Sequence, residues 1–171
     1  MSMSSAAIPT FEITLTALSQ LLDKAEAHAA AKKFDVANLL AARLAPDMFA
    51  LTRQVQVACD LAKFGAARLS GVEPPKFEDN EKSVADLKAR IAKTLDFVRS
   101  ADRKAIDGSA ERAINFPLGP KKGEMKGADY LNHFILPNFY FHAAAAYMIM
   151  RHNGVELGKQ DFLSGIPIKI T

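Results

Sequence analysis

Residues 8–29, IPTFEITLTALSQLLDKAEAHA, decide the fold class of this chain. Apolar side chains recur along this stretch at spacings of three and four, which places them on one face of an α-helix. Pro9 stands at the start of the pattern, where a proline costs no hydrogen bond. The stretch therefore predicts an amphipathic helix over about residues 8–31. Its buried face consists of Ile8, Phe11, Leu15, Leu18, Leu22, Ala25 and Ala29.

The same spacing marks three further helices later in the chain. One is expected over about residues 46–69, opened by a proline. Another is expected over about residues 81–100, with Asn80 as its cap. The last is expected over about residues 128–153 and ends before Gly154. Because four helices with one apolar stripe each hide those stripes against one another, we expect an all-α four-helix bundle.

Outside these helices the sequence pattern changes. The 110–120 region loses the helical spacing, and residues 113–116 form a candidate extended piece. In the tail, residues 154–171, isoleucines near the end occupy every second position, which predicts another short extended piece. The chain has 171 residues and no internal repeat, which corresponds to about one domain. We therefore expect a single domain over residues 1–171.

Composition and charge exclude several classes of function. The chain carries 22 basic and 19 acidic residues, for a net charge of +3. Its basic residues form no clustered patch, which argues against nucleic-acid binding. No apolar run approaches the ~20 residues of a membrane span, and residues 1–7 lack the regions of a signal peptide. Since Cys59 has no intrachain disulfide partner, we expect a cytoplasmic protein with neither nucleic-acid nor membrane partners.

Two polar residues fall on the expected core face of the last helix. Asn138 and His142 are four residues apart, so they share one side of the helix about a turn apart. An unsatisfied buried polar group costs on the order of 1–3 kcal/mol, so each of them needs a partner. His142 is the best candidate for a catalytic residue. Pro137, directly before Asn138, favours equally a kink in this helix and the start of a new one.

The C-terminal half of the sequence resembles a known family. The motifs are LPNFYFH at 136–142, Tyr147, RHNG at 151–154 and GKQDFL at 158–163. They resemble the DUF1993 family of uncharacterised bacterial proteins, which is similar to the DinB/YfiT-like four-helix bundles. The resemblance extends over nearly the whole chain, from Phe11 to Gly165, although the first half is generic helix.

This resemblance implies an up-down-down-up bundle that forms a homodimer and holds a divalent metal with three histidines. One histidine comes from the second helix and two come from an H-x-x-x-H pair on the fourth. In this chain the three positions correspond to Asp47, Asn138 and His142, so one of the three is still histidine. Carboxylate and imidazole groups suit zinc or nickel, whereas an amide oxygen is a weak ligand for either metal.

The favoured hypothesis is a polar cluster of Asp47, Asn138 and His142 at the position of the family's metal centre. The cluster would bind a small molecule, or weakly a divalent metal such as zinc or nickel. Tyr140 and Tyr147 are expected as further ligand-binding residues. Two alternatives stay open: a metal-dependent transferase or hydrolase of the DinB/YfiT type, and a non-catalytic structural or stress protein that acts as a homodimer.

Overall fold

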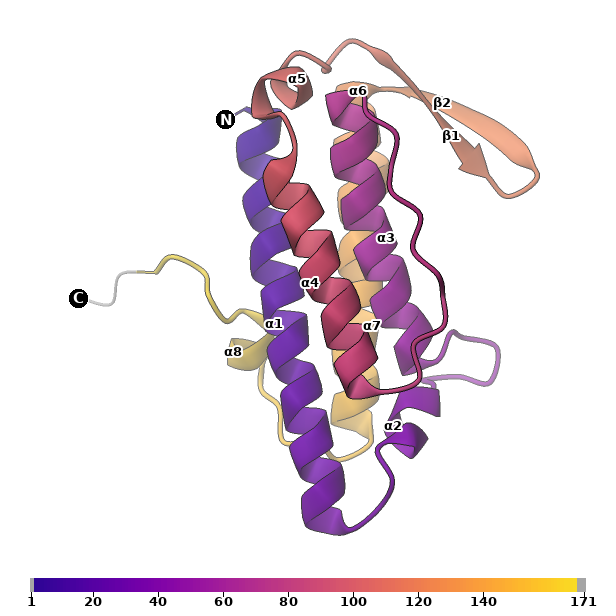
Figure 1. The fold of residues 1–171 in the computed structure, drawn as a ribbon, viewed down its shortest axis with the longest axis vertical. Coiled ribbons are helices and arrows are strands. Elements are labelled where there is room, and N and C mark those ends of the chain that lie inside the picture. The colour runs from indigo at the N-terminus through magenta and orange to yellow at the C-terminus, as the bar shows by residue number, and fades with distance from the viewer. Residues whose placement is uncertain (1, 169–171) are drawn as a thin grey trace.

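Four long helices form the body of the molecule in the computed structural model, which describes residues 2–168. They are α1 (Met3–Lys32), α3 (Leu51–Ser70), α4 (Val84–Ser100) and α7 (Leu136–His152). Figure 1 shows them side by side, with α1 and α7 running in one direction and α3 and α4 in the other. The contacts between α1 and α4, and between α3 and both α4 and α7, are the most extensive among the helices. The mostly helical fold class expected from the sequence is confirmed.

Shorter elements lie between and after the long helices. An extended crossover, residues 71–83, runs along the outside of the bundle from the end of α3 to the start of α4 (Figure 1). The remaining elements are α2 (Ala37–Ala41), α5 (Arg103–Asp107), β1 (Ala113–Leu118), β2 (Lys121–Lys126), α6 (Gly127–Asp129), the π-helix η1 (Tyr130–Ile135) and α8 (Lys159–Phe162).

The apolar faces of the helices meet in one core. The fully buried rings of Phe11 in α1 and Phe139 in α7 lie edge to face, with centroids 5.1 Å apart, which is a favourable aromatic geometry. Gly65 of α3 lies where an added Cβ would come within 2.9 Å of the Ile135 side chain and 3.2 Å of Phe11. The missing side chain therefore lets α3 approach its neighbours closely.

The core face of the last helix includes Leu131, Ile135, Ala145 and Ile149, as expected, but not Asn138 and His142. It also includes Phe139 and Ala146, which are fully buried. Asn138 and His142 are half-buried and lie at the edge of that face. At 100° per residue, a side chain one position from a core residue leaves the core but stays close to the neighbouring helix. His142 is therefore near Gln54 of α3, and both polar groups are partly open to solvent.

The first helix begins five residues earlier than the sequence predicted. Its cap is Ser2, whose hydroxyl oxygen accepts a hydrogen bond from the Ser5 N–H at 3.3 Å. Pro9 therefore lies inside α1 and not in its first turn. Because proline has no N–H, the Ser5 carbonyl lacks its ordinary intrahelical donor at this point.

The second long helix begins at Leu51, five residues later than the expected start at residue 46. Residues 42–50 form a loop that is closed by one side-chain hydrogen bond and one backbone hydrogen bond. Arg43 donates to the Met48 carbonyl at 2.7 Å, and the Leu51 N–H donates to the Ala42 carbonyl at 3.0 Å. These bonds take up backbone groups that a helix would have used, so Asp47 lies in a loop.

The third long helix is capped by Ser83 and not by Asn80. The Ser83 hydroxyl accepts from the Asp86 N–H at 3.1 Å, and the Asp86 carboxylate accepts from the Ser83 N–H at 3.0 Å. This reciprocal pair is a capping box, and its S-x-x-D pattern is readable in the sequence. The helix therefore starts at Val84, three residues after the expected start.

Residues 127–152 are helical throughout but in three parts. The short α6 leads into the wider π-helical turn η1, and α7 follows at once with Pro137 in its first turn. A proline there sacrifices no intrahelical hydrogen bond. Since the preceding turn is wider than an α-turn, the ring also avoids the carbonyl four residues earlier. Pro137 therefore marks the start of α7 while the chain continues as a helix through it.

A small antiparallel hairpin extends beyond one end of the bundle (Figure 1). Its strands β1 and β2 pair in register up to Leu118 opposite Lys121, around a turn where Gly119 has a φ of +58°. Glycine adopts that conformation without steric cost. Phe116 of β1 packs against the buried ring of Tyr130, 4.9 Å between centroids, and fixes the hairpin to η1. The extended piece expected in the 110–120 region is thus present as one strand of this sheet.

The tail folds back onto α1 through its short helix α8. Lys24 of α1 pairs with Asp161 at 2.5 Å, and the Ser164 hydroxyl bonds Gln20 at 2.9 Å. Residues 153–168 contain no strand, and the rest of the extended piece expected in the tail, residues 169–171, lies outside the described residues. Within residues 2–168, no helix combines the length and the apolar character needed to span a lipid bilayer.

Candidate functional site

His142 of α7 is held by a glutamine from α3. The His142 Nδ1 and the Gln54 Oε1 are 2.7 Å apart, although the residues are 88 positions apart in the sequence. Gln54 is buried, and its Nε2 donates to the Phe49 carbonyl at 3.2 Å. Because a carbonyl only accepts, the amide nitrogen must face Phe49, which turns the Gln54 oxygen towards the imidazole. Two helices and the loop before α3 therefore fix the orientation of one histidine ring.

This geometry also fixes the tautomer of His142. Since Gln54 Oε1 is an acceptor, the proton of the neutral imidazole lies on Nδ1, and Nε2 carries a free lone pair. Burial lowers the pKa of His142, and the positive charge of Arg53 lowers it further. The ring is therefore neutral at neutral pH. A neutral imidazole with an oriented Nε2 can accept a hydrogen bond, take a proton or bind a metal.

Aromatic side chains flank the imidazole on the surface. Phe49 stacks nearly parallel to the His142 ring, with centroids 6.3 Å apart and 23° between planes. Phe141 lies edge to face with it at 5.2 Å. These two rings are 49% and 57% exposed, so they present apolar surface beside the imidazole ring. The Arg53 guanidinium lies 5.8 Å from the centre of the Phe49 ring and completes the rim.

The other two members of the expected polar cluster are placed differently. Asn138 is one turn before His142, but its Nδ2 donates to the Phe134 carbonyl of the same helical segment at 2.6 Å. Asp47 is exposed in the loop between α2 and α3. Among residues 2–168 no hydrogen bond joins Asp47, Asn138 and His142 to one another. The polar partner that His142 does have is Gln54.

Tyr140 and Tyr147 lie on other faces of α7 than His142. Tyr140 precedes His142 by two residues, a rotation of about 200°, and Tyr147 follows by five, about 140°. Tyr140 is 44% exposed and packs against Phe139. The ring of Tyr147 contacts Phe162 of α8, with centroids 5.7 Å apart. Neither residue contributes to the rim formed by Phe49 and Phe141.

The donor set around His142 does not match a three-histidine metal centre. Across the described residues, no three side chains of histidine, cysteine, aspartate or glutamate come together to hold a metal ion. The Gln54 oxygen already accepts from the imidazole Nδ1–H, and Asp47 is exposed in the loop before α3. Zinc sites in proteins use three or four strong ligands. The residues present here supply one strong ligand, His142.

A second polar cluster lies between α3, α4 and the crossover, and the sequence analysis did not identify it. Its centre is Arg90 of α4, whose side chain is 2% exposed. The guanidinium pairs at 2.9 Å with Asp60 of α3 and with Asp79 and Glu81 of the crossover. It also donates to the Glu78 carbonyl at 3.1 Å. We call these five residues the Arg90 cluster, and it attaches the crossover to the bundle.

Neutral and aromatic groups complete the surroundings of the Arg90 cluster. Gln56 of α3 donates to Glu81 at 2.7 Å. Burial opposes ionisation of Glu81, but the hydrogen bonds from Arg90 and Gln56 outweigh it and lower the pKa of that carboxyl. The buried Lys63 pairs with Asp60 at 2.9 Å and lies 4.5 Å from the centre of the Phe77 ring. The crossover is thus held by charge pairs and by an aromatic contact.

Arg53 joins the two polar regions. Its guanidinium contacts the Phe49 ring beside His142 and pairs with Asp79 of the Arg90 cluster at 2.5 Å. Cys59 lies beneath the Arg90 cluster, and its burial raises the pKa of the thiol to about 12. A thiol with that pKa is protonated and unreactive at neutral pH.

The sequence contains a signal for the missed residues. Gln54 lies three residues after Leu51, and Arg90 three residues after Leu87, so both occupy apolar-stripe positions of their helices. A polar residue at a stripe position needs a buried partner. The sequence analysis applied that argument to α7 alone.

The chain is similar to known proteins over nearly its whole length. The model of the family DUF1993, a domain of unknown function, matches residues 3–163. The crystal structure of a DinB family member protein from Shewanella denitrificans superposes with a TM-score of 0.91 at 40% sequence identity. That comparison covers 98% of this chain and 95% of the other. No curated protein matches the sequence.

Proposed function

The chain belongs to the DUF1993 family, and on that premise we propose that it binds a small molecule through His142. The observation that carries the proposal is the Gln54–His142 hydrogen bond of 2.7 Å. By holding the proton on Nδ1, Gln54 leaves Nε2 as a hydrogen-bond acceptor on an imidazole flanked by the exposed rings of Phe49 and Phe141. An acceptor next to apolar surface suits a small apolar molecule that carries one hydroxyl or N–H donor.

The sharpest test compares two probes that differ by a single hydroxyl group. The probes are p-cresol and toluene, and the readout is the ¹⁵N chemical shift of His142 Nε2. We expect p-cresol to shift this signal and toluene to leave it in place, because toluene has no donor for Nε2. In the Gln54→Leu variant the tautomer is no longer held, so the response to p-cresol should weaken. His152→Ala, at an exposed position of α7, is the matched control.

Two results would contradict this proposal. Equal responses to both probes would mean apolar contact alone, and no response to either would remove His142 as a ligand-binding group. In the first case His142→Ala would bind both probes as well as the unchanged protein does.

A second candidate function is weak binding of a divalent metal by His142 with Asp47 and Asn138. Support for it comes from the DinB family structure that the chain resembles and from the oriented lone pair of His142. To test this candidate, the protein is first treated with a chelator, and zinc or nickel is then added. The bound metal is measured by elemental analysis, and its effect on stability by thermal melting. A content of about one metal ion per chain would favour this candidate if it is lost in His142→Ala and reduced in Asp47→Asn. That result would also support a metal-dependent transferase or hydrolase activity. No retained metal would count against it.

The assembly proposed for the chain is a homodimer of DinB/YfiT-like up-down-down-up bundles. The helix directions in Figure 1 and the similarity to the DinB family member support the bundle. Exposed apolar side chains on α7, among them Phe141 and Met148, support the dimer. A homodimer without catalytic activity is the structural alternative, and it predicts that neither probes nor metals bind at His142. We also propose a cytoplasmic location, which suits the free Cys59.

A further inference from the structure

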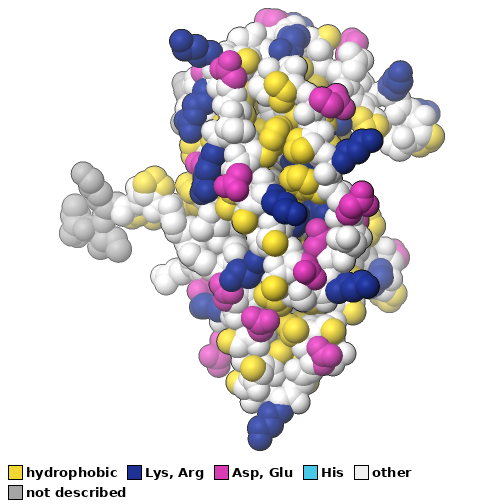
Figure 2. All heavy atoms as spheres, viewed as in Figure 1, with side chains coloured by type: hydrophobic (Ala, Val, Ile, Leu, Met, Phe, Trp, Pro, Cys, Tyr) yellow, Lys and Arg dark blue, Asp and Glu magenta, His cyan; other side chains and the backbone are white. Residues whose placement is uncertain are grey.

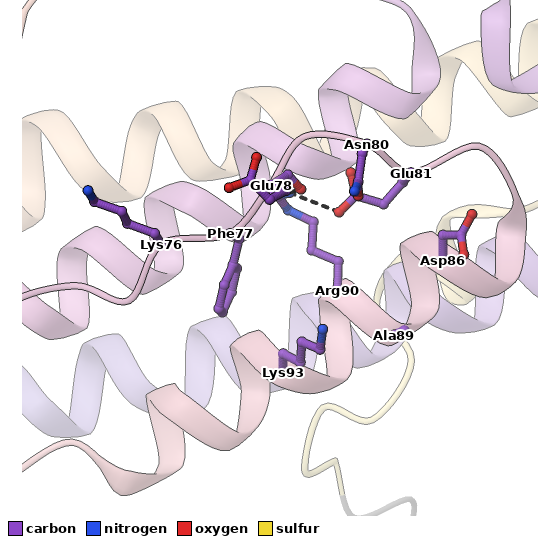
Figure 3. A pocket seen from close by; sticks show the side chains of 9 residues that line it. All are labelled: Lys76, Phe77, Glu78, Asn80, Glu81, Asp86, Ala89, Arg90 and Lys93. Carbon is purple, nitrogen blue, oxygen red and sulfur yellow. Dashed lines mark hydrogen bonds and ion pairs between the residues drawn. The ribbon is translucent and has the colours of Figure 1, made fainter.

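The concave surfaces of the molecule differ in the charges that line them. Figure 3 shows the cavity between the crossover and α4, which is lined by side chains of both signs: Glu78, Glu81, Asp86, Arg90 and Lys93. Figure 2 shows acidic and basic side chains interspersed in the same way over this face of the bundle. A cleft attracts a charged ligand when its lining carries one sign of charge, and this cavity lacks that property.

A hollow with positive charge alone lies between the end of α3 and the hairpin, at one end of the bundle (Figure 1). Its volume is about 360 Å³, which is within the range of roughly 300–1,000 Å³ typical of small-molecule sites. Its lining consists of Arg68, Gly71, Arg112 and residues 113–115 of β1, with no acidic residue. Within residues 2–168 neither arginine forms an ion pair. We call this hollow the Arg68–Arg112 hollow.

Neutral groups hold Arg68 in place. Its Nη1 donates to the Tyr130 hydroxyl at 2.8 Å, and its guanidinium lies 4.6 Å from the centre of the Phe64 ring. Burial raises the pKa of Tyr130, so the hydroxyl stays protonated and does not neutralise the arginine. In the described part of the chain these contacts leave Nε and Nη2 without a partner, and neither nitrogen is buried. Arg68 is therefore oriented, while part of its guanidinium stays open to an external acceptor.

Arg112 is held by the carboxyl end of α3. Its Nη2 donates to the carbonyls of Arg68 and Leu69 at 2.6 and 2.9 Å. Gly71 ends α3 with a φ of +79°, and a Cβ at that position would lie 3.3 Å from Arg112 Nη1. Glycine therefore leaves the guanidinium uncrowded. The carbonyls of a helix end offset only part of the charge of Arg112, and its Nη1 and Nε keep no partner among residues 2–168.

Two fixed guanidinium groups with no acid beside them favour a dianion. A carboxylate carries one negative charge, whereas a phosphomonoester carries about −1.5 to −2 at pH 7 and offers three acceptor oxygens. Those oxygens match the N–H donors that both arginines leave free. A macromolecular interface takes roughly 20–30 residues on each side, whereas six residues line this hollow. The lining therefore suits a small molecule.

We propose that the Arg68–Arg112 hollow binds the phosphate group of a small phosphomonoester. The phosphate oxygens accept hydrogen bonds from Arg68 and Arg112. Asn115 of β1 is exposed in the same lining and offers its amide to a polar group of the ester. This site does not depend on the function proposed for His142.

Titration of the whole chain with methyl phosphate and dimethyl phosphate tests the proposal. The two probes differ by one methyl group and one negative charge, and the readout is the ¹H–¹⁵N signals of the Arg68 and Arg112 Nε groups. We expect methyl phosphate to bind about tenfold more tightly, because the diester lacks one charge-assisted interaction. Arg112→Gln, followed at Arg68, should weaken methyl phosphate about tenfold and remove its advantage over the diester.

A second variant leaves both arginines in place. Asn115→Asp adds a negative charge to the lining at an exposed position whose side chain makes no hydrogen bond within residues 2–168. We expect methyl phosphate to bind about fivefold more weakly, because the new carboxylate offsets one arginine, while the melting temperature stays the same. Arg151→Gln, an exposed arginine at the opposite end of the bundle (Figure 1), is the matched control and should bind as the unchanged chain does.

The proposal fails on any of three results. Equal binding of the two probes would mean that the hollow recognises a single charge and not a phosphomonoester. Unchanged binding in both Arg112→Gln and Asn115→Asp would place the probe elsewhere on the molecule. No shift of either arginine signal at millimolar methyl phosphate would mean that the hollow binds no phosphate group.

Discussion

At the scale of a residue, His142 connects the stability of the fold to pH just below neutrality. Burial and the charge of Arg53 hold its pKa below the ordinary value of 6.5 in the folded chain. Unfolding exposes the ring and restores that value, so between the two pKa values the unfolded state binds more protons. The contribution of the neutral ring is therefore complete above the unfolded pKa and is lost as the pH falls through the lower, folded pKa.

Urea unfolding from neutral pH down to about 5 measures this effect. We expect the free energy of unfolding to fall less steeply with acidification in His142→Gln than in the unchanged chain. His152→Gln, an exposed histidine of the same helix, should keep the original slope. Glu81 and Asp86 have lowered pKa values from starting values of 4.5 and 3.8, so their effect appears at lower pH. Identical slopes in both histidine variants would refute the role given to His142.

At the scale of an element, the crossover depends on one arginine. Arg90→Met removes the cation that faces Asp60 and Glu81, which are 19% and 8% exposed in their side chains. Breaking a buried ion pair from one side costs about 3–5 kcal/mol, because the partner charge stays buried. We expect a loss of that order in the free energy of unfolding measured with urea. We also expect the amide hydrogens next to residues 71–83 to exchange faster than those in the rest of the chain.

The control for this prediction is a surface pair between two other elements. Arg99 of α4 pairs with Glu12 of α1 at 3.0 Å, and its side chain is 53% exposed. Arg99→Met should cost less than about 1 kcal/mol, as exposed pairs do. Losses of similar size in Arg90→Met and Arg99→Met would show that the crossover is held by its packing and not by the Arg90 cluster.

At the scale of the whole molecule, the sequence predicted the existence of the long helices better than the residues at which they start. Apolar spacing reports which side of a helix is buried, and it identified the long helices in sequences such as residues 8–29. Helix starts depended on local hydrogen bonds instead. The capping box of Ser83 was readable in the sequence, whereas the bond from Leu51 to Ala42 was not.

In the candidate site, His142 was predictable from the sequence, and its hydrogen-bond partner was not. His142 stood out as a polar group close to a core face, and the structure gives it a buried hydrogen-bond partner. That partner, Gln54, is 88 positions away, and no local spacing relates residues on two different helices. Asn138 lies at the edge of the core face, and its side chain donates to the Phe134 carbonyl, a local hydrogen bond that the spacing of apolar residues did not indicate.

The exposed surface of α7 predicts how two copies of the chain associate. Phe141 and Met148 are 57% and 51% exposed and lie seven residues apart, so they share one face of the helix. A stable dimer buries about 800 Å² per partner around an apolar centre. On this face a second copy would also shield the rings beside His142, so ligand binding and dimerisation would be coupled.

Sedimentation velocity at micromolar concentrations decides this last prediction. We expect the unchanged chain to sediment as a dimer and Phe141→Glu to sediment as a monomer with the same helical content, since the new charge cannot be buried without a partner. Leu118→Glu, at a 53% exposed apolar position on the hairpin, should stay dimeric. If the unchanged chain is monomeric, the exposed rings of α7 do not form a dimer interface. A monomeric Leu118→Glu would instead move the interface from α7 to the hairpin.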